Sequence, residues 1–222
     1  MKPEATFLGS SIGKKIVMAV TGLVLVLFVL GHMAGNLQIY KGAEALDAYS
    51  EFLHHLLHGA GLWIARIVLL ACAALHIWAA VGLTRMNAAA RPVAYRKVEP
   101  KASTWASRYM RVTGFLLLFF IVFHLLNLTT GQWHPGGEYV KGAVYANVVS
   151  TFRVPWVAAL YIVAMIALAG HLSHGIWSLM QTLGWNHPRY NALRKQIAWV
   201  LTLLVVVANI SFPVAVLAGI VR

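Results

Sequence analysis

Residues 156–180 read WVAALYIVAMIALAGHLSHGIWSLM and contain no aspartate, glutamate, lysine or arginine. A helix needs about 20 apolar residues to cross the hydrocarbon core of a bilayer, so this segment is long enough to span one. Four more apolar stretches of similar length lie at residues 16–40, 62–83, 112–130 and 197–220. The sequence therefore predicts an all-α integral membrane protein, with five transmembrane helices forming a single domain over residues 1–222.

The composition supports this fold class. Hydrophobic residues make up 60% of the chain and charged residues 11%, against about 25% charged residues in a soluble domain. The mean hydropathy is +0.72. These values exclude a soluble enzyme and a disordered chain, because too few polar side chains are present to cover a water-exposed surface. The one cysteine, Cys72, excludes an internal disulfide or a thiolate-bound iron–sulfur cluster within this chain.

The net charge of +12 is distributed unevenly among the segments that connect the spans. Thirteen of the 18 basic residues fall in the N-terminal tail and in the second and fourth connections: Lys2, Lys14, Lys15, Arg85, Arg91, Arg96, Lys97, Lys101, Arg108, Arg111, Arg189, Arg194 and Lys195. Cytoplasmic segments of membrane proteins carry such an excess of lysine and arginine. We therefore expect a cytoplasmic N-terminus, an outer C-terminus and no binding of nucleic acid.

The two outer connections contain further structural signals. Leu46, Tyr49, Leu53 and Leu56 recur at helical spacing within residues 45–58, which predicts a short helix in the outer interface. The second outer connection, residues 131–155, is rich in glycine and aromatic residues and can also lie against the membrane. The sequence shows no repeat of fixed period. The first span runs past the length of a signal peptide, so we expect it to be retained.

Each of the first four spans contains at least one histidine, whereas the fifth contains none. Ionisable residues within a span are costly and usually functional. Counted from the outer end of each span, His32 and His124 lie 8 and 7 residues deep. His76 and His171 lie 13 and 15 residues deep. Because a helix rises about 1.5 Å per residue, these histidines form two levels roughly 10 Å apart.

Each level contains one histidine from each of two non-adjacent helices, which fits two planar cofactors, each held between two imidazoles. Haem iron is the common cofactor with two such axial positions. A tetrahedral zinc site is disfavoured because the four histidines do not share a depth. On spacing alone, His174 competes with His171 for the ligand role. Small residues near the histidines allow close approach of a macrocycle or of another helix: Gly31, Gly35, Ala73, Ala74, Ala79, Ala80, Gly82, Ala167, Gly170 and Gly175.

Several short motifs follow one another along nearly the whole chain: Thr21-Gly22-Leu23, Gly31-His32-Met33, His76, Arg111-Val112-Thr113-Gly114-Phe115, His124, and His171-x-Ser173-x-Gly175 before Trp177-Ser178. Their order and spacing resemble the five-helix, two-haem cytochrome b subunit of bacterial succinate dehydrogenases and fumarate reductases. By this resemblance His171, rather than His174, is a ligand. The resemblance implies an inner haem on His76 and His171 and an outer haem on His32 and His124.

The resemblance also implies a function and partners. The chain would anchor a flavoprotein subunit and an iron–sulfur subunit in the cytoplasmic membrane of a bacterial cell and relay electrons between the iron–sulfur clusters and a membrane quinone. By analogy, two haems favour menaquinone. The chain would not oxidise succinate on its own. Ala169 occupies a position where some family members carry a glutamate linked to transmembrane proton movement, so we expect that proton route to be absent.

Other polar residues are candidates for binding the haem propionates or the quinone. The propionate candidates are Arg108, Arg111, Lys15 and Ser173 on the inner side and Arg66 on the outer side. Quinone reduction needs a proton-carrying group at the interface, and the candidates there are Glu51, His54, His55, His58 and Asn36. Each basic residue also fits a purely topological role, and each outer residue also fits the solvated face of an amphipathic helix.

Two other classes of protein compete with this interpretation. The membrane subunit of a nitrate reductase or formate dehydrogenase also carries two haems, but it distributes its histidines differently among the spans. A transporter or proton channel can use histidines within its spans, yet acidic residues or broken helices are then expected there. All six acidic residues of this chain lie outside the predicted spans.

Overall fold

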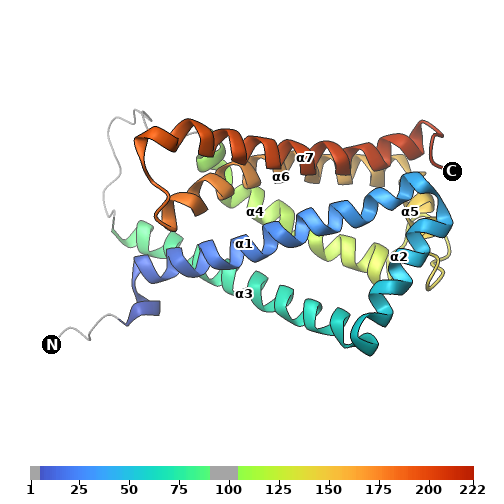
Figure 1. The fold of residues 1–222 in the computed structure, drawn as a ribbon, viewed down its shortest axis with the longest axis horizontal. Helices are drawn as coiled ribbons and strands as arrows, with labels where there is room; N and C mark the ends of the chain where they lie inside the picture. Colours follow the sequence, from blue (N-terminus) through green and yellow to red (C-terminus); the bar gives the residue numbers. More distant parts are fainter. Residues whose placement is uncertain (1–5, 91–104) are drawn as a thin grey trace.

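The computed structural model describes residues 6–90 and 105–222, which form an all-α bundle with no strand in those ranges (Figure 1). The main helices are α1 (Ser11–Asn36), α2 (Ala43–His55), α3 (Ala60–Ala89), α4 (Trp105–His124), α5 (Val144–Phe152), α6 (Pro155–Thr182) and α7 (Asn191–Leu217). Short helical turns join them: η1 (Phe7–Gly9), η2 (Leu37–Lys41), η3 (Leu56–Gly59), η4 (Leu125–Thr129) and η5 (Pro188–Tyr190). The predicted all-α membrane fold is confirmed.

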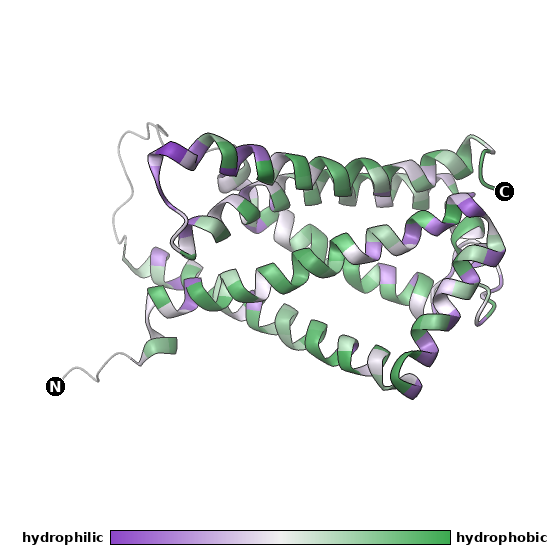
Figure 2. Cartoon of the chain, viewed as in Figure 1, coloured by the Kyte–Doolittle hydropathy of each residue, from purple (hydrophilic) through white to green (hydrophobic). Residues whose placement is uncertain are grey.

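Five helical segments of the described chain are long and apolar enough to cross a membrane: those built on α1, α3, α4, α6 and α7. Their central parts are hydrophobic along their length (Figure 2). At one end the helices run further than the apolar stretches predicted: α1 begins at Ser11, and α3 continues to Ala89. At the other end α7 stops at Leu217, three residues before the predicted boundary at 220. Hydropathy marks only the part of a helix that lies in lipid, whereas backbone hydrogen bonding continues into the interface.

The end of the bundle where α1 begins, and where α3 and α6 end, is called the inner end below (Figure 1). The described residues of the predicted basic set lie on the parts of α1, α3, α4, η5 and α7 nearest this end. Lys2, Arg91, Arg96, Lys97 and Lys101 lie outside the described residues.

Backbone contacts connect the long helices in a defined pattern. α1 packs along α3, α4 packs along α6, and α6 also packs against α1 and α7. α1 and α4 are not in extensive backbone contact, and neither are α3 and α6 or α3 and α4. The spans built on α1, α3 and α4 bury little of their surface within the chain, whereas α6 is the most buried span, with 44% of its most apolar window buried. The bundle is therefore organised around α6.

The outer end is covered by α2 and α5, which lie next to each other (Figure 1). α2 confirms the short helix predicted at residues 45–58, and Leu46 on it is buried. The backbone N–H of Tyr145 donates to Asp47 Oδ1 at 2.8 Å and connects the two short helices. Between α2 and α3 the chain reverses at Leu57 and His58, both with positive φ. This backbone conformation is unfavourable for residues with a Cβ and therefore depends on the surrounding packing.

The first six helices form two similar halves. α1, α2 and α3 follow the order long, short, long, and α4, α5 and α6 repeat it. In each half the second long helix packs along the first. In addition, α1 carries Thr21-Gly22 and then His32, and α4 carries Thr113-Gly114 and then a histidine at the same interval. The two halves thus share an order of helices, a packing pattern and one short motif.

Candidate functional site

The two histidines of the inner pair come from two helices whose backbones are not in extensive contact. His76 comes from α3 and His171 from α6, and their ring centroids are 6.4 Å apart with an angle of 55° between the rings. Both side chains lie in the inner half of their helices. The two imidazoles therefore face each other across the interior of the bundle.

The outer pair repeats this arrangement between the other two helices. His32 on α1 and His124 on α4 have ring centroids 5.8 Å apart, and their rings are nearly perpendicular at 88°. The His32 ring also stacks on Phe28 at 5.3 Å. The structure brings together the same two pairs that depth in the membrane groups in the sequence.

The spacing of both pairs suits a single metal ion between the rings. An imidazole nitrogen lies about 2.0–2.1 Å from a bound first-row metal, so two such imidazoles on one metal place their ring centroids about 6 Å apart. Within the described ranges no group of three or more His, Cys, Asp or Glu side chains could hold a metal ion. Two imidazoles are the set of protein ligands that suits a metal whose remaining ligands belong to a cofactor, as in a haem.

Glycines leave space beside the imidazoles. A Cβ added at Gly22 would lie 3.4 Å from His76 Cε1, and one added at Gly114 would lie 3.6 Å from His171 Cε1. At Gly31 and Gly175 a Cβ would meet no atom within 4 Å. These positions fit a flat macrocycle on the two histidine pairs.

Other small residues serve packing within the chain instead. A Cβ at Gly35 would lie 2.5 Å from Tyr49 Cε1, because the Tyr49 ring fills the space beside this glycine. At Gly82 a Cβ would lie 2.7 Å from Lys14 Cε. Of the two alternatives for small residues near the histidines, Gly35 and Gly82 therefore fit the close approach of another helix.

Threonines lie beside both inner histidines. Thr21 Oγ1 is 3.3 Å from His76 Nδ1, and Thr113 Oγ1 is 3.3 Å from His171 Nδ1. Both threonines are buried. Each one comes from the helix that packs along the helix of its histidine.

The outer pair has a different hydrogen-bonding environment. His124 Nδ1 lies 3.2 Å from the Tyr161 hydroxyl, which also accepts a hydrogen bond from Asn127 Nδ2 at 3.2 Å. Asn127 is fully buried in η4, a π-helical turn directly after His124. Its Oδ1 accepts from Thr151 Oγ1 at 3.2 Å. Such π turns are frequent at functional sites.

This network continues to the second outer connection. His134 Nδ1 lies 3.0 Å from Asn127 Oδ1, and His134 Nε2 lies 3.0 Å from Ser150 Oγ. No described protein group forms a hydrogen bond with His32. The two histidines of the outer pair therefore differ in their surroundings.

His174, the other candidate in α6, occupies a different place. Its ring contacts Trp177 on the same helix, with centroids 6.1 Å apart. The structure places His171, not His174, opposite His76.

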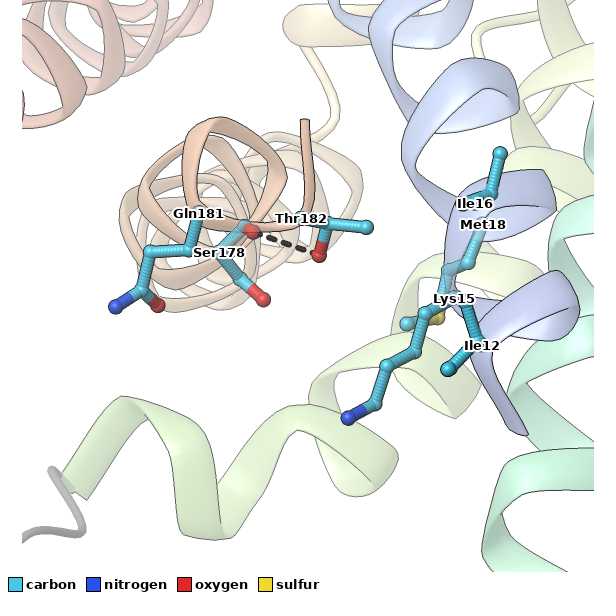
Figure 3. A pocket seen from close by; sticks show the side chains of 7 residues that line it. All are labelled: Ile12, Lys15, Ile16, Met18, Ser178, Gln181 and Thr182. Carbon is cyan, nitrogen blue, oxygen red and sulfur yellow. Dashed lines mark hydrogen bonds between the residues drawn. The ribbon is translucent and has the colours of Figure 1, made fainter. Parts of the chain in front are cut away.

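Two cavities lie at the inner end. One, of about 440 Å³, lies between α1 and α6 and is lined by Ile12, Lys15, Ile16, Met18, Ser178, Gln181 and Thr182. Figure 3 shows Ser178 and Thr182 on α6 across from Lys15 on α1. The other, of about 570 Å³, is lined by Thr84, Asn87, Ala88 and Arg111.

The predicted propionate candidates are therefore distributed as follows. Lys15 and Arg111 line these cavities. Arg108 is exposed near the start of α4. Ser173 is buried and donates to Gly170 O of its own helix at 3.2 Å. Arg66 lies over the ring of Trp63, with its guanidinium carbon 5.0 Å from the ring centroid.

The predicted quinone candidates lie in α2, in the turn after it and at the end of α1. Glu51 and His55 are largely exposed and lie 3.9 Å apart on successive turns of α2. His54 Nδ1 is 2.8 Å from Ser50 O of the same helix. His58 lies in the reversal before α3, and Asn36 ends α1. Among the described residues, neither cavity includes any of them.

Sequence reasoning missed the polar residues that contact the histidines. Thr21 and Thr113 belong to motifs that support the resemblance, but they received no role of their own. The signal that identifies them is the repeated Thr-Gly followed by a histidine at the same interval. Tyr161 and Asn127 carry no comparable signal, since their contacts depend on the π turn and on the rotation of α6.

Comparison with known proteins assigns the chain to a family. The family described as "Succinate dehydrogenase/Fumarate reductase transmembrane subunit" matches residues 85–210. The succinate dehydrogenase cytochrome b558 subunit of Bacillus subtilis is 26% identical over 160 residues, covering 71% of this chain and 72% of the relative. No solved structure gives a significant match. The protein belongs to the family of transmembrane subunits of succinate dehydrogenase and fumarate reductase.

Proposed function

We propose that this membrane subunit is a cytochrome b that carries two haems and passes electrons between the other subunits of its complex and a membrane quinone. The observation that supports this most strongly is the pair of facing imidazole sets, at 6.4 Å and 5.8 Å, on helices without extensive backbone contact. A bound haem supplies reversible one-electron chemistry at its iron. The name of the Bacillus subtilis relative, a cytochrome b558 subunit, agrees with a haem of the b type.

The four histidines would hold the two haems without a covalent bond. His76 and His171 would hold the inner haem, and His32 and His124 the outer haem. Because each pair comes from two diagonal helices, the ligands fix the orientation of the macrocycle relative to the bundle. The surrounding apolar side chains keep water from the imidazoles and lower the local dielectric constant.

The two cavities at the inner end suit the carboxylates of the inner haem. Ser178 lies two helical turns beyond His171, roughly 10 Å along α6, on the same face. Lys15 adds a positive charge and Thr182 a hydroxyl on the walls of the same cavity. Arg111, in the second cavity, adds another positive charge. Charged hydrogen bonds to carboxylates are among the stronger ones in proteins, so these residues would fix the edge of the macrocycle.

The family and the charge distribution support a proposal for the partners and the orientation. A flavoprotein subunit and an iron–sulfur subunit would dock at the inner end, where the described basic residues lie, and this end would face the bacterial cytoplasm. A quinone, by analogy menaquinone, would react near the outer haem. Glu51, His54, His55, His58 and Asn36 remain candidates for its site and for proton supply, and Arg66 for the outer propionates.

A haem count with optical spectra tests the proposal. The purified complex should show a reduced-minus-oxidised b-type spectrum and contain about two haems per copy of this chain, as two bis-histidine sites require. A colourless preparation would contradict the proposal, and a single haem per chain would contradict the second site. Addition of a menaquinol analogue should reduce both haems. If it reduces neither haem, the quinone does not exchange electrons with this subunit.

A further inference from the structure

The two inner histidines have equivalent hydrogen-bond partners in the two halves of the fold. In the first half, Thr21 of α1 contacts His76 of α3, and in the second, Thr113 of α4 contacts His171 of α6. The separations along the chain, 55 and 58 residues, are nearly equal. A contact that both halves make independently reflects a shared requirement of the two histidines.

The proton of each threonine hydroxyl is already engaged. Thr21 Oγ1 donates to Val17 O at 2.7 Å, one turn back on its own helix. Thr113 Oγ1 has two such carbonyl acceptors on its own helix, Tyr109 O and Met110 O, both at 3.1 Å. A hydroxyl has only one proton, so while that proton is donated to a carbonyl of its own helix the oxygen acts toward the imidazole as an acceptor.

The acceptor role fixes the form of the imidazole. Nδ1 of His76 and of His171 must carry the proton that it donates to the threonine. A neutral imidazole has one protonated nitrogen, so Nε2 is left with its lone pair free. A metal ion binds to that lone pair. Each threonine thus holds its histidine in the form that can be an iron ligand, with Nε2 available.

The carbonyls of Met18 and Met110 lie near the same imidazoles. They are also 3.3 Å from Thr21 Oγ1 and 3.1 Å from Thr113 Oγ1. As acceptors, they too favour a protonated Nδ1. The threonine differs from these carbonyls because its side chain also contacts the imidazole from the neighbouring helix and fixes its rotation. In metal sites, such partners outside the ligand set orient the ligand and raise its basicity.

We propose that Thr21 and Thr113 are positioning residues that hold His76 and His171 as ligands of the inner haem and lower its midpoint potential. This inference rests on the proposed function, since it assumes a haem between these two histidines. A more basic imidazole stabilises the oxidised iron, which is why the threonines lower the potential. The outer haem lacks such a threonine pair, because His124 faces Tyr161 and His32 has no hydrogen bond within the described chain.

The test uses variants of each threonine in the purified complex. Thr21→Val and Thr113→Val keep the side-chain shape and remove the acceptor, whereas Thr21→Ser and Thr113→Ser keep the hydroxyl. The matched control is Thr202→Val, because Thr202 is fully buried and donates to Ala198 O of its own helix but contacts no histidine. The readouts are haem content, the low-spin electron paramagnetic resonance signal of each haem, and a redox titration.

We expect each valine variant to bind the inner haem about 10–100-fold more weakly, the range typical for loss of such a partner. The inner haem that remains should have a higher midpoint potential and an altered paramagnetic signal, and the outer haem should not change. The serine variants should restore the wild-type values, and the Thr202 control should match the wild type.

Several results would overturn the inference. Valine variants with wild-type inner-haem content, signal and potential would show that the carbonyls alone suffice. A valine variant that changes only the outer haem would also overturn the inference, because the threonines would then not act on the inner haem. If a valine variant does not assemble, Thr→Ala is compared with Thr→Ser at that position, because these differ only in the hydroxyl, and equal inner-haem properties would reject the role. If the wild type contains no haem, the proposed function fails instead.

Discussion

The Tyr161 hydroxyl lies 3.2 Å from Nδ1 of His124, and it joins an outer ligand candidate to a buried polar network. Tyr161 also contacts the rings of Phe120 and Phe152 edge-on, at 5.0 and 4.9 Å. Its position is therefore fixed by packing as well as by hydrogen bonds. Tyr161 thus places a hydroxyl beside Nδ1 of His124, as Thr21 and Thr113 do beside Nδ1 of the two inner histidines.

Replacement of Tyr161 with phenylalanine should keep the fold and both haems, because the ring packing remains. If His124 binds iron through Nε2, its Nδ1 carries the proton and the Tyr161 oxygen, 3.2 Å away, accepts it. Loss of that oxygen would then make the imidazole less basic, so the midpoint potential of the outer haem should rise. A redox titration of the purified complex measures this shift. A change confined to the inner haem would contradict the arrangement described for the outer pair.

Removal of one histidine should remove one haem. His76→Ala or His171→Ala should leave only the outer haem, and His32→Ala or His124→Ala only the inner haem. The matched control is His174→Ala, which should retain both haems, since His174 contacts Trp177 rather than a partner histidine. Haem content and the spectra of the remaining haem check this. Loss of a haem in the His174 variant would reverse the choice of ligand in α6.

Asn127→Ala should destabilise the outer end of the bundle. Asn127 is fully buried and forms hydrogen bonds with Tyr161, Thr151 and His134. A buried group left without its partner costs about 1–3 kcal/mol, so the variant should unfold at a lower temperature in detergent. Asn209→Ala is the control, because the Asn209 side chain donates to Val205 O of its own helix. Equal losses in the two variants would show that the network adds no specific stability.

Gly35→Ala should disturb the packing of α2 on α1, since the new Cβ would overlap the ring of Tyr49. Overpacking of this kind costs about 1–3 kcal/mol. Gly31→Ala is the matched control for packing, because a Cβ there meets no protein atom within 4 Å. Thermal unfolding of the two haem-free proteins should therefore differ, with a loss only in the Gly35 variant. If Gly35→Ala does not lower the unfolding temperature, α2 can move away from α1 without a loss of stability.

Lys15→Gln should lower the midpoint potential of the inner haem. A positive charge stabilises the reduced, more electron-rich cofactor, and its removal at a distance of about 10 Å changes the energy by roughly 1–2 kcal/mol at an effective dielectric constant near 20. Arg111→Gln should act in the same direction. Lys41→Gln, near the opposite end of the bundle, is the control and should leave the inner potential unchanged. If neither Lys15→Gln nor Arg111→Gln changes the midpoint potential of the inner haem, these two residues serve only to orient the chain in the membrane.

The membrane fold and the grouping of the histidines could be predicted because both depend on position along a helix. Apolar length defines a span, and the depth of a residue follows from the helical rise. This is why His32 was grouped with His124, and His76 with His171, without any knowledge of helix packing.

The contacts of the histidines could not be predicted in the same way. They depend on how each helix is rotated about its axis, which is set by packing between distant segments. Gly35 illustrates the difficulty, since it lies near His32 in sequence but accommodates Tyr49 from α2. The similarity of the two halves is hard to predict from the sequence, because only a few residues are the same in both. It becomes visible in the order and packing of the helices.

The packing of α3 bears on what a cofactor in the proposed inner site would add to the bundle. α3 contacts α1, α2 and the turn between α2 and itself, but has no extensive backbone contact with α4 or α6. A macrocycle held between His76 and His171 would connect α3 directly to α6. Its loss should therefore loosen α3 more than the four other spans.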